Sequence, residues 1–188
     1  MNVLLFPGAG SDSAHPSLVA IEAALAPHRV VRADFPYRLA GRKAPDRAPV
    51  LLAAVRAAVA ELPADEPLVL GGRSMGGRMC SLIAAGADGE PPPPNLKGLV
   101  LICYPLHPPG KPDRLRVEHL PDVRVPTLFV SGDRDAFGTP DELRRWSATM
   151  PAKAKPEHLF LEGRDHSLQH ADHTIAGAVT DFVARRVR

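Results

Sequence analysis

Short apolar runs alternate with amphipathic segments along the whole chain. Each run is bounded by glycine, proline or polar residues, a pattern typical of strands that are buried on both faces. The predicted strands are residues 2–6, 29–35, 68–70, 96–103, 126–130 and 158–161. Between them, apolar side chains recur with the period of a helix. The predicted helices are residues 17–26, 49–62, 75–87, 139–150 and about 168–182.

This alternation of strands and helices predicts an α/β architecture. Strands joined by helical crossovers form a mostly parallel sheet with right-handed connections, and the helices then cover both of its faces. We therefore expect a sheet of about six strands within a single domain that spans residues 1–188. The reactive groups of such a sheet lie on loops at the carboxyl ends of its strands.

Two proline-rich connectors interrupt the pattern. Residues 91–94 are four consecutive prolines, which exclude regular structure, and residues 104–126 have room for at most one short helix, around residues 114–120. Neither connector is long enough for a folded cap domain, so we expect a rather open site. Its expected boundaries are residues 35–39, residues 104–109 and Phe137.

Composition and charge narrow the possible partners. The net charge is +2 without a basic stripe, and aromatic residues make up 5% of the chain, which argues against nucleic-acid binding. No apolar segment approaches the ~20 residues that a membrane span requires, and the first residues lack the basic region of a signal peptide. The two cysteines, Cys80 and Cys103, make no disulfide framework. We expect a cytoplasmic protein with a small-molecule substrate, and the sequence leaves the oligomeric state open.

The strand at residues 68–70 runs directly into the motif G-R-S-M-G at residues 72–76, which fits G-x-S-x-G. In a nucleophile elbow of this kind, the serine occupies a cramped turn between a strand and a helix. Glycines flank it because a β-carbon there would collide with neighbouring chain. The alternative is an ordinary glycine-rich turn. The strand before the motif and the helix after it favour the elbow, with Ser74 as the nucleophile.

A serine hydroxyl is a weak nucleophile, so it needs a histidine base that an acidic side chain orients. His166 lies in the loop between the last predicted strand and the last helix, at the favoured sheet edge, and it is preferred among eight histidines. Asp135 ends the loop after the fifth predicted strand and is the candidate acid, with Asp133 as its nearest rival.

A metal site is the alternative interpretation of the same histidine. His166, His170 and His173 have the spacing of one face of a helix, and Asp165 or Asp172 would add a further ligand. This segment lacks the glutamate that a zinc hydrolase uses as its base. We therefore expect no metal.

A carbonyl oxygen under attack by Ser74 becomes negatively charged and needs two backbone N–H donors. Met75 supplies one at the start of the helix that follows the elbow. Ala9, in the loop after the first strand, is the candidate for the second donor, and Gly10 is the next choice.

The same loop, with Asp34 near the end of the second strand, half resembles a dinucleotide-binding fingerprint. The third glycine of that fingerprint is replaced here by Ser13, and His15-Pro16 delays the helix that would receive the pyrophosphate. A dinucleotide site would also leave the elbow unexplained. We therefore expect no cofactor.

Four segments of the chain together resemble one known group of proteins. They are residues 71–78, 104–112, 125–130 and 165–167. With them, the chain resembles a small α/β-hydrolase of the dienelactone-hydrolase-like group, in the branch related to the KANL/Tex proteins, over most of its length. The resemblance implies an α/β-hydrolase fold, and the short connectors make it a minimal one without a cap domain. The resemblance also implies a triad of Ser74, Asp135 and His166, in the chain order of that fold.

The chain departs from this group in two places. The group's first loop more often begins with histidine, where this chain has Pro7, and true dienelactone hydrolases use a cysteine where this chain has Ser74. The resemblance therefore implies a class of reaction rather than one substrate. We expect a serine hydrolase that acts through an acyl-enzyme on small esters, thioesters or lactones. The alternative is a catalytically silent module that uses the fold for interaction.

Candidate substrate contacts are Arg73, Tyr104 and Phe137. Arg73 and Arg78 flank the elbow, where a guanidinium group is able to hold a substrate carboxylate or phosphate. The alternative is that both arginines pair with local carboxylates or with water.

Overall fold

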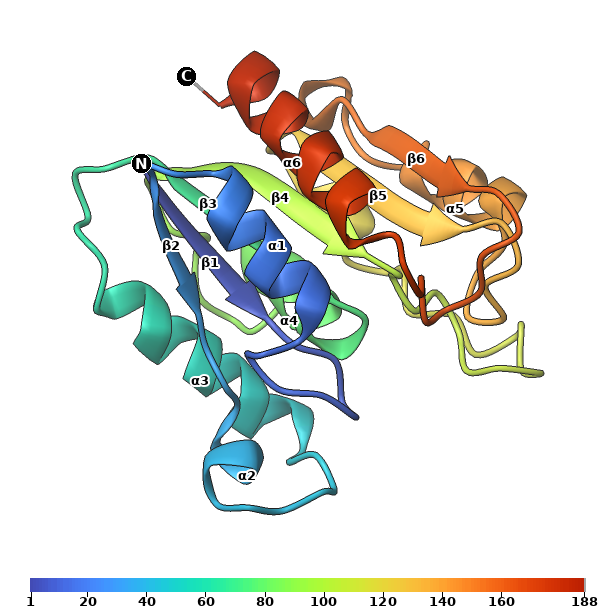
Figure 1. Cartoon of the computed structure of the whole chain (residues 1–188), viewed down its shortest axis with the longest axis horizontal. Helices are drawn as coiled ribbons and strands as arrows, with labels where there is room; N and C mark the ends of the chain where they lie inside the picture. Colours follow the sequence, from blue (N-terminus) through green and yellow to red (C-terminus); the bar gives the residue numbers. More distant parts are fainter. Residues whose placement is uncertain (188) are drawn as a thin grey trace.

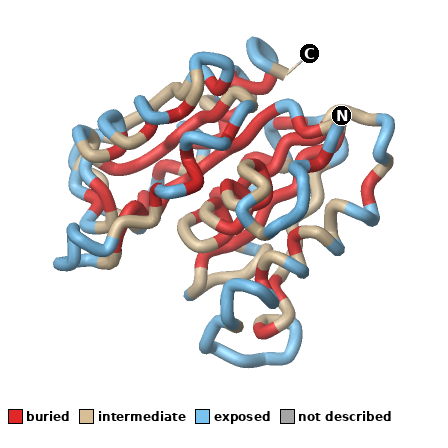
Figure 2. The backbone as a smooth tube through the Cα atoms, turned by 180° about the vertical axis from the view of Figure 1, so that it is seen from behind, coloured by how far each residue is buried: buried red, intermediate tan, exposed pale blue. Residues whose placement is uncertain are grey.

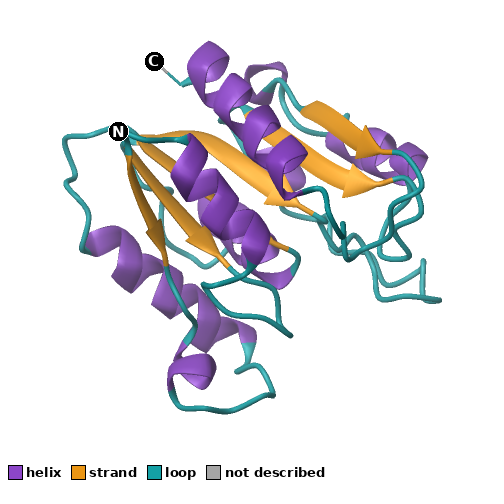
Figure 3. Ribbon diagram, viewed as in Figure 1, coloured by secondary structure: helices purple, strands orange, loops and turns teal. Residues whose placement is uncertain are grey.

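The apolar runs form the strands of one continuous sheet. The structure, a computed structural model, describes residues 1–187. All neighbouring strands are parallel, in the order β2-β1-β3-β4-β5-β6 (Figure 3). The strands are β1 (Asn2–Phe6), β2 (Arg29–Arg32), β3 (Leu68–Arg73), β4 (Leu96–Ile102), β5 (Thr127–Gly132) and β6 (Glu157–Leu161). The predicted α/β class and number of strands are confirmed.

Apolar side chains occupy most positions of the central strands because both faces of the sheet are covered. In β1, Val3 and Leu5 pack on one face while Leu4 and Phe6 pack on the other, and all four are fully buried. Successive side chains of a strand point to opposite faces, so burial on both sides hides the usual alternation. Figure 2 shows this buried sheet inside a shell of exposed turns.

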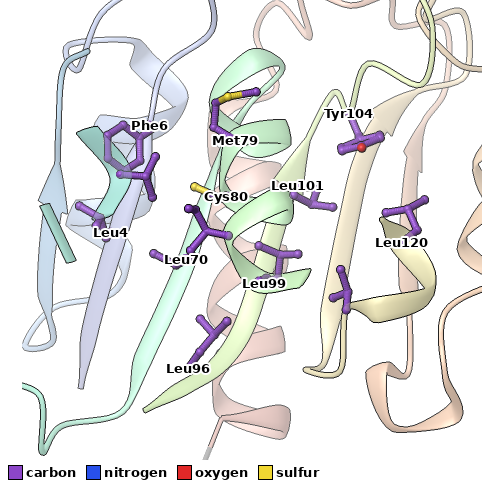
Figure 4. Close-up of a cluster of buried hydrophobic side chains, with 14 of the residues drawn as sticks. Leu4, Phe6, Leu70, Met79, Cys80, Leu96, Leu99, Leu101, Tyr104 and Leu120 are labelled. Atoms are coloured by element: carbon purple, nitrogen blue, oxygen red, sulfur yellow. The ribbon is translucent and has the colours of Figure 1, made fainter. Parts of the chain in front are cut away.

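The helices divide between the two faces of the sheet. α1 (Pro16–Ala24) and α6 (Asp172–Arg186) lie side by side on one face (Figure 1). Helices α3, α4 and α5 cover the other face, where Met79 and Cys80 of α4 lie among the leucines of the sheet (Figure 4). The bounds of these three helices are α3 (Ala48–Ala60), α4 (Met75–Ala85) and α5 (Pro140–Ser147).

The final helix begins later than the sequence predicted. α6 starts at Asp172, whereas Leu168 and His170 have φ angles of 49° and 59°, which a right-handed helix cannot contain. Leu168 is 1% exposed and packs against the same core as α6. Leu168 therefore belongs to a loop, although its spacing in the sequence fits the apolar positions of the helix that follows.

Two further segments differ from the prediction. β2 ends at Arg32, because Phe35 leaves the sheet to pack against Phe6, with 4.9 Å between the two ring centroids. Phe35 is followed by a short helix that was not predicted, α2 (Pro36–Leu39). No α-helix forms around residues 114–120, where the sequence left room for at most one, and the segment holds one 3₁₀ turn, η1 (Leu120–Asp122). A second such turn, η2 (Ala152–Ala154), precedes β6.

Among the described residues, no helix is long and apolar enough to cross a membrane.

The proline-rich segment at residues 104–126 is a packed wall beside α4. Tyr104 and Leu120 are each 1% exposed, and the Tyr104 hydroxyl donates to the Arg116 carbonyl oxygen at 2.8 Å. Ser81 of α4 lies 2.7 Å from Nε2 of the buried His119, counted between Oγ and the ring nitrogen. These contacts fix a segment that has almost no regular structure of its own.

His119 should make stability depend on pH. Burial, with a further contribution from the nearby Arg78, lowers the pKa of His119 from 6.5 to about 4. Between these two values the unfolded chain binds a proton that the folded chain rejects, so stability falls as the pH decreases from about 6.5 to about 4. The expected loss is at most on the order of 3 kcal/mol.

Urea unfolding at pH 7 and pH 4.5 measures this effect. His119→Gln keeps an amide to pair with Ser81 but does not titrate, so its stability should fall less across the same interval. Equal losses in the two proteins would show that His119 does not govern the acid response.

Candidate active site

Ser74 occupies a strained turn between β3 and α4. Its φ and ψ angles are 48° and −113°, and its N–H donates to the Ile102 carbonyl oxygen at 2.7 Å. A β-carbon on Gly76 would lie 2.5 Å from the Pro7 carbonyl oxygen, and one on Gly72 would lie 2.9 Å from the Gly76 carbonyl carbon. Only glycine allows the turn to approach the end of β1 this closely. The strand, turn and helix thus have the geometry predicted for a nucleophile elbow.

The structure brings Ser74, His166 and Asp135 into one hydrogen-bonded chain. Ser74 Oγ lies 3.0 Å from His166 Nε2, and His166 Nδ1 lies 2.8 and 2.9 Å from the two carboxylate oxygens of Asp135. Asp135 is 2% exposed and also accepts a hydrogen bond from the Phe137 N–H at 2.9 Å. Asp133, the rival candidate, makes no hydrogen bond to the histidine. The carboxylate that contacts His166 is therefore held in place by the loop that carries it.

A cavity of about 490 Å³ opens over Ser74 and His166. Phe137 lines it, with its ring centroid 4.1 Å from that of His166. Both candidate backbone donors, Ala9 and Met75, also border the cavity. Met75 is the first residue of α4, where N–H groups have no partner within the helix, and the Ala9 carbonyl accepts a hydrogen bond from the Tyr37 hydroxyl at 2.9 Å. The remaining lining residues are Gly10, Asp46, Ala48, Leu51, Arg78, Met79, Pro105 and Arg116.

Two candidate substrate contacts lie outside this cavity. Arg73 is 7% exposed and donates to the carbonyl oxygens of His166 and Ser167, the latter at 2.8 Å. Tyr104 is buried in the proline-rich wall. The structure therefore places Arg73 behind the loop of His166, where it anchors the backbone that carries the imidazole. Phe137 is the one residue of this group that the structure places at the cavity.

Sequence reasoning missed several of the residues that line the cavity. Leu51 and Met79 were visible only as members of apolar helical stripes, which indicate burial rather than a site. Arg116 lies in the proline-rich wall, where no periodicity indicates which way a side chain points. Asp46 lies just before a predicted helix, a position that indicates no site, yet it lines the cavity and pairs with Arg42 at 2.8 Å.

The three histidines of the metal interpretation do not share a helical face, because His166 and His170 both precede α6. Within residues 1–187, one group of side chains is close enough to hold a metal ion, with ligand atoms within 4.8 Å of one another. It consists of Cys103, Asp135 and His166. Burial raises the pKa of the Cys103 thiol to about 12, which keeps it protonated and makes it a poor ligand. Its Sγ donates instead to the His166 carbonyl oxygen at 3.3 Å.

Asp34, the acidic residue of the dinucleotide interpretation, already has hydrogen-bond partners within the protein. Both carboxylate oxygens of Asp34 accept hydrogen bonds from Ser13, each at 2.7 Å, one from the backbone N–H and one from the hydroxyl. Asp34 therefore fixes the loop after β1. This contact gives the carboxylate a structural partner in place of a ribose.

The strand order and the elbow at the end of β3 together define an α/β-hydrolase fold. A family model described as an alpha/beta hydrolase domain matches residues 1–183, and the chain belongs to that family.

Solved structures share the same fold at low sequence identity. The ferulic-acid-bound Est1E from Butyrivibrio proteoclasticus superposes with a TM-score of 0.75 at 17% identity, covering 99% of this chain and 89% of that one. Mouse alpha/beta hydrolase domain-containing protein 10 gives a TM-score of 0.75 at 16% identity, covering 98% and 90%. Monoacylglycerol lipase from Paleococcus ferrophilus gives 0.75 at 15% identity, covering 98% and 94%.

Alanine should have opposite effects at Gly76, in the elbow, and at Gly177, in the interior of α6. Gly76→Ala should destabilise the fold by about 2 kcal/mol or more, because its β-carbon would overlap backbone that has little room to move. Gly177→Ala is the matched control, since a β-carbon there meets nothing within 4 Å in the interior of α6. It should stabilise the protein by about 0.5–1 kcal/mol. Thermal unfolding of both variants measures the contrast, and a neutral Gly76→Ala would contradict the close contact.

Proposed function

We propose that the protein is a serine hydrolase of the carboxylesterase, thioesterase or lactonase type. Ser74 is the nucleophile, His166 is the general base, and Asp135 positions the imidazole. The observation that carries this proposal is the hydrogen-bonded chain from Ser74 Oγ through His166 to Asp135, which opens on a cavity. A buried carboxylate at Nδ1 holds the tautomer in which Nε2 accepts the serine proton.

The reaction follows from these three groups. Ser74 Oγ adds to the carbonyl carbon of the ester while its proton passes to His166 Nε2. The imidazolium then gives this proton to the departing alcohol, which leaves the acyl group bound to Ser74. Water then releases the acyl group by the same steps. His166 takes a proton from water, the resulting hydroxide adds to the acyl carbon, and the acid departs as Ser74 regains a proton.

The carbonyl oxygen carries negative charge at each addition step. The N–H groups of Met75 and Ala9 are the proposed donors, because both residues border the cavity beside Ser74. The helix dipole of α4 adds to the effect of Met75. The hydrogen bond from Tyr37 to the Ala9 carbonyl supports this role, since it restrains the loop that presents the second donor.

The size of the cavity supports a small substrate, and the relatives support an ester. A volume of about 490 Å³ lies in the lower half of the usual range of ligand pockets. The protein from Paleococcus ferrophilus with the same fold is described as a monoacylglycerol lipase. We also place the chain in the dienelactone-hydrolase-like group related to the KANL/Tex proteins, on the strength of its proline-rich wall.

Labelling with a fluorophosphonate probe distinguishes this hydrolase from a catalytically silent interaction module. The wild-type protein should be labelled at Ser74, because the probe reacts with a serine that a neighbouring base activates. Ser74→Ala should abolish labelling and reduce turnover of p-nitrophenyl acetate by at least about 10³-fold. A folded wild-type protein with neither labelling nor turnover would favour the interaction module.

The two aspartates of the β5 loop should differ in their effect on rate. Asp135→Asn should lower kcat by about 10³–10⁴-fold, since an amide at this position favours the wrong tautomer of His166. Asp133→Asn is the matched control two residues away and should change kcat far less. Steady-state kinetics on folded variants checks this, and comparable losses would leave Asp135 without its proposed role.

A further inference from the structure

Two arginines line the cavity over Ser74 from different elements. Arg78 lies one turn along α4 from Ser74, and the backbone N–H of Arg78 donates to the Ser74 carbonyl oxygen at 3.0 Å. Arg116 reaches the same cavity from the proline-rich wall. Both arginines therefore line the one cavity that opens over Ser74.

Neither arginine has a carboxylate partner among residues 1–187. No acidic oxygen of these residues lies within 4.0 Å of a nitrogen of either side chain. Arg78 Nε is buried without a hydrogen-bond partner. At this nitrogen, no acceptor among the described residues holds the Arg78 guanidinium group in place.

The two positive charges also act on each other. Burial lowers the pKa of Arg116, and the charge of Arg78 lowers it further. Asp46 is the one acidic side chain on the cavity wall, and one of its oxygens pairs with Arg42 at 2.8 Å. The two arginines and Asp46 leave one net positive charge among the lining side chains. A single carboxylate would balance this charge.

We propose that Arg78 and Arg116 form a carboxylate subsite, so that the substrates are esters that carry a free carboxylate a few bonds from the scissile carbonyl. This proposal rests on the hydrolase function proposed above. A guanidinium group matches the planar carboxylate with two parallel N–H donors, and it does so best where water is partly excluded. Leu51 and Met79 supply apolar walls for the carbon atoms between the ester and the carboxylate.

The test compares esters that differ only in the carboxylate. p-Nitrophenyl hemiglutarate carries it on the acyl side, and p-nitrophenyl valerate is its neutral match. p-Carboxyphenyl acetate carries it on the leaving group, and its methyl ester is the neutral match. In one of these pairs, the anionic ester should have a kcat/KM at least about tenfold higher, in line with hydrogen bonds to charged groups.

Substitution of each arginine should remove this preference. Arg78→Gln and Arg116→Gln should each lower the ratio of anionic to neutral kcat/KM by about tenfold. Arg114→Gln is the matched control, because Arg114 is exposed on the same wall and outside the cavity, and it should leave the ratio unchanged. Wild-type ratios near one in both pairs, or ratios that persist in both variants, would overturn the subsite.

A binding measurement separates this proposal from the hydrolase function. Ser74→Ala keeps the cavity, so it should bind monomethyl glutarate in calorimetry, and adding Arg116→Gln should weaken that binding by about tenfold. Binding without any turnover by the wild-type protein would support the subsite and contradict the hydrolase. Turnover of neutral esters without carboxylate preference, and without binding of monomethyl glutarate, would do the reverse.

Discussion

The close contact between the elbow and the end of β1 is the constraint on which the candidate site depends. β-Carbons at Gly72 and Gly76 would overlap the backbone of the strand end and of the turn itself, so the two segments meet without side chains between them. This contact fixes where α4 begins and hence where Ser74 points. It also brings the loop after β1 beside the first N–H groups of α4. Nucleophile and proposed oxyanion donors therefore follow from one backbone contact.

A second backbone contact orients the histidine. The loops after β5 and β6 pack directly on each other, with the Arg134 N–H donating to the Arg164 carbonyl oxygen at 2.9 Å. A β-carbon on Gly132 would collide with that same carbonyl group. Arg73 then ties the β6 loop to the end of β3 through the His166 carbonyl. Because backbone contacts hold both loops, the imidazole stays oriented between carboxylate and serine.

The sequence by itself determined the order of elements, the parallel α/β sheet and the position of Ser74. These features depend on local patterns, namely the period of apolar residues and the glycines around one serine, and such patterns are complete within a short stretch of chain. The loops of His166 and Asp135 were also predictable, because parallel strands place their carboxyl ends at one edge of the sheet.

The tertiary structure decided which side chains of those loops and walls meet. Asp135 and Asp133 share a loop, and only the backbone path between β5 and β6 selects the one that contacts the histidine. Arg73 sits beside the nucleophile in sequence but anchors a loop behind it, whereas Arg116 is distant in sequence and lines the cavity. Leu168 has helical spacing but is buried from a turn. In each case the deciding contacts join residues far apart in the chain, and no local pattern carries that information.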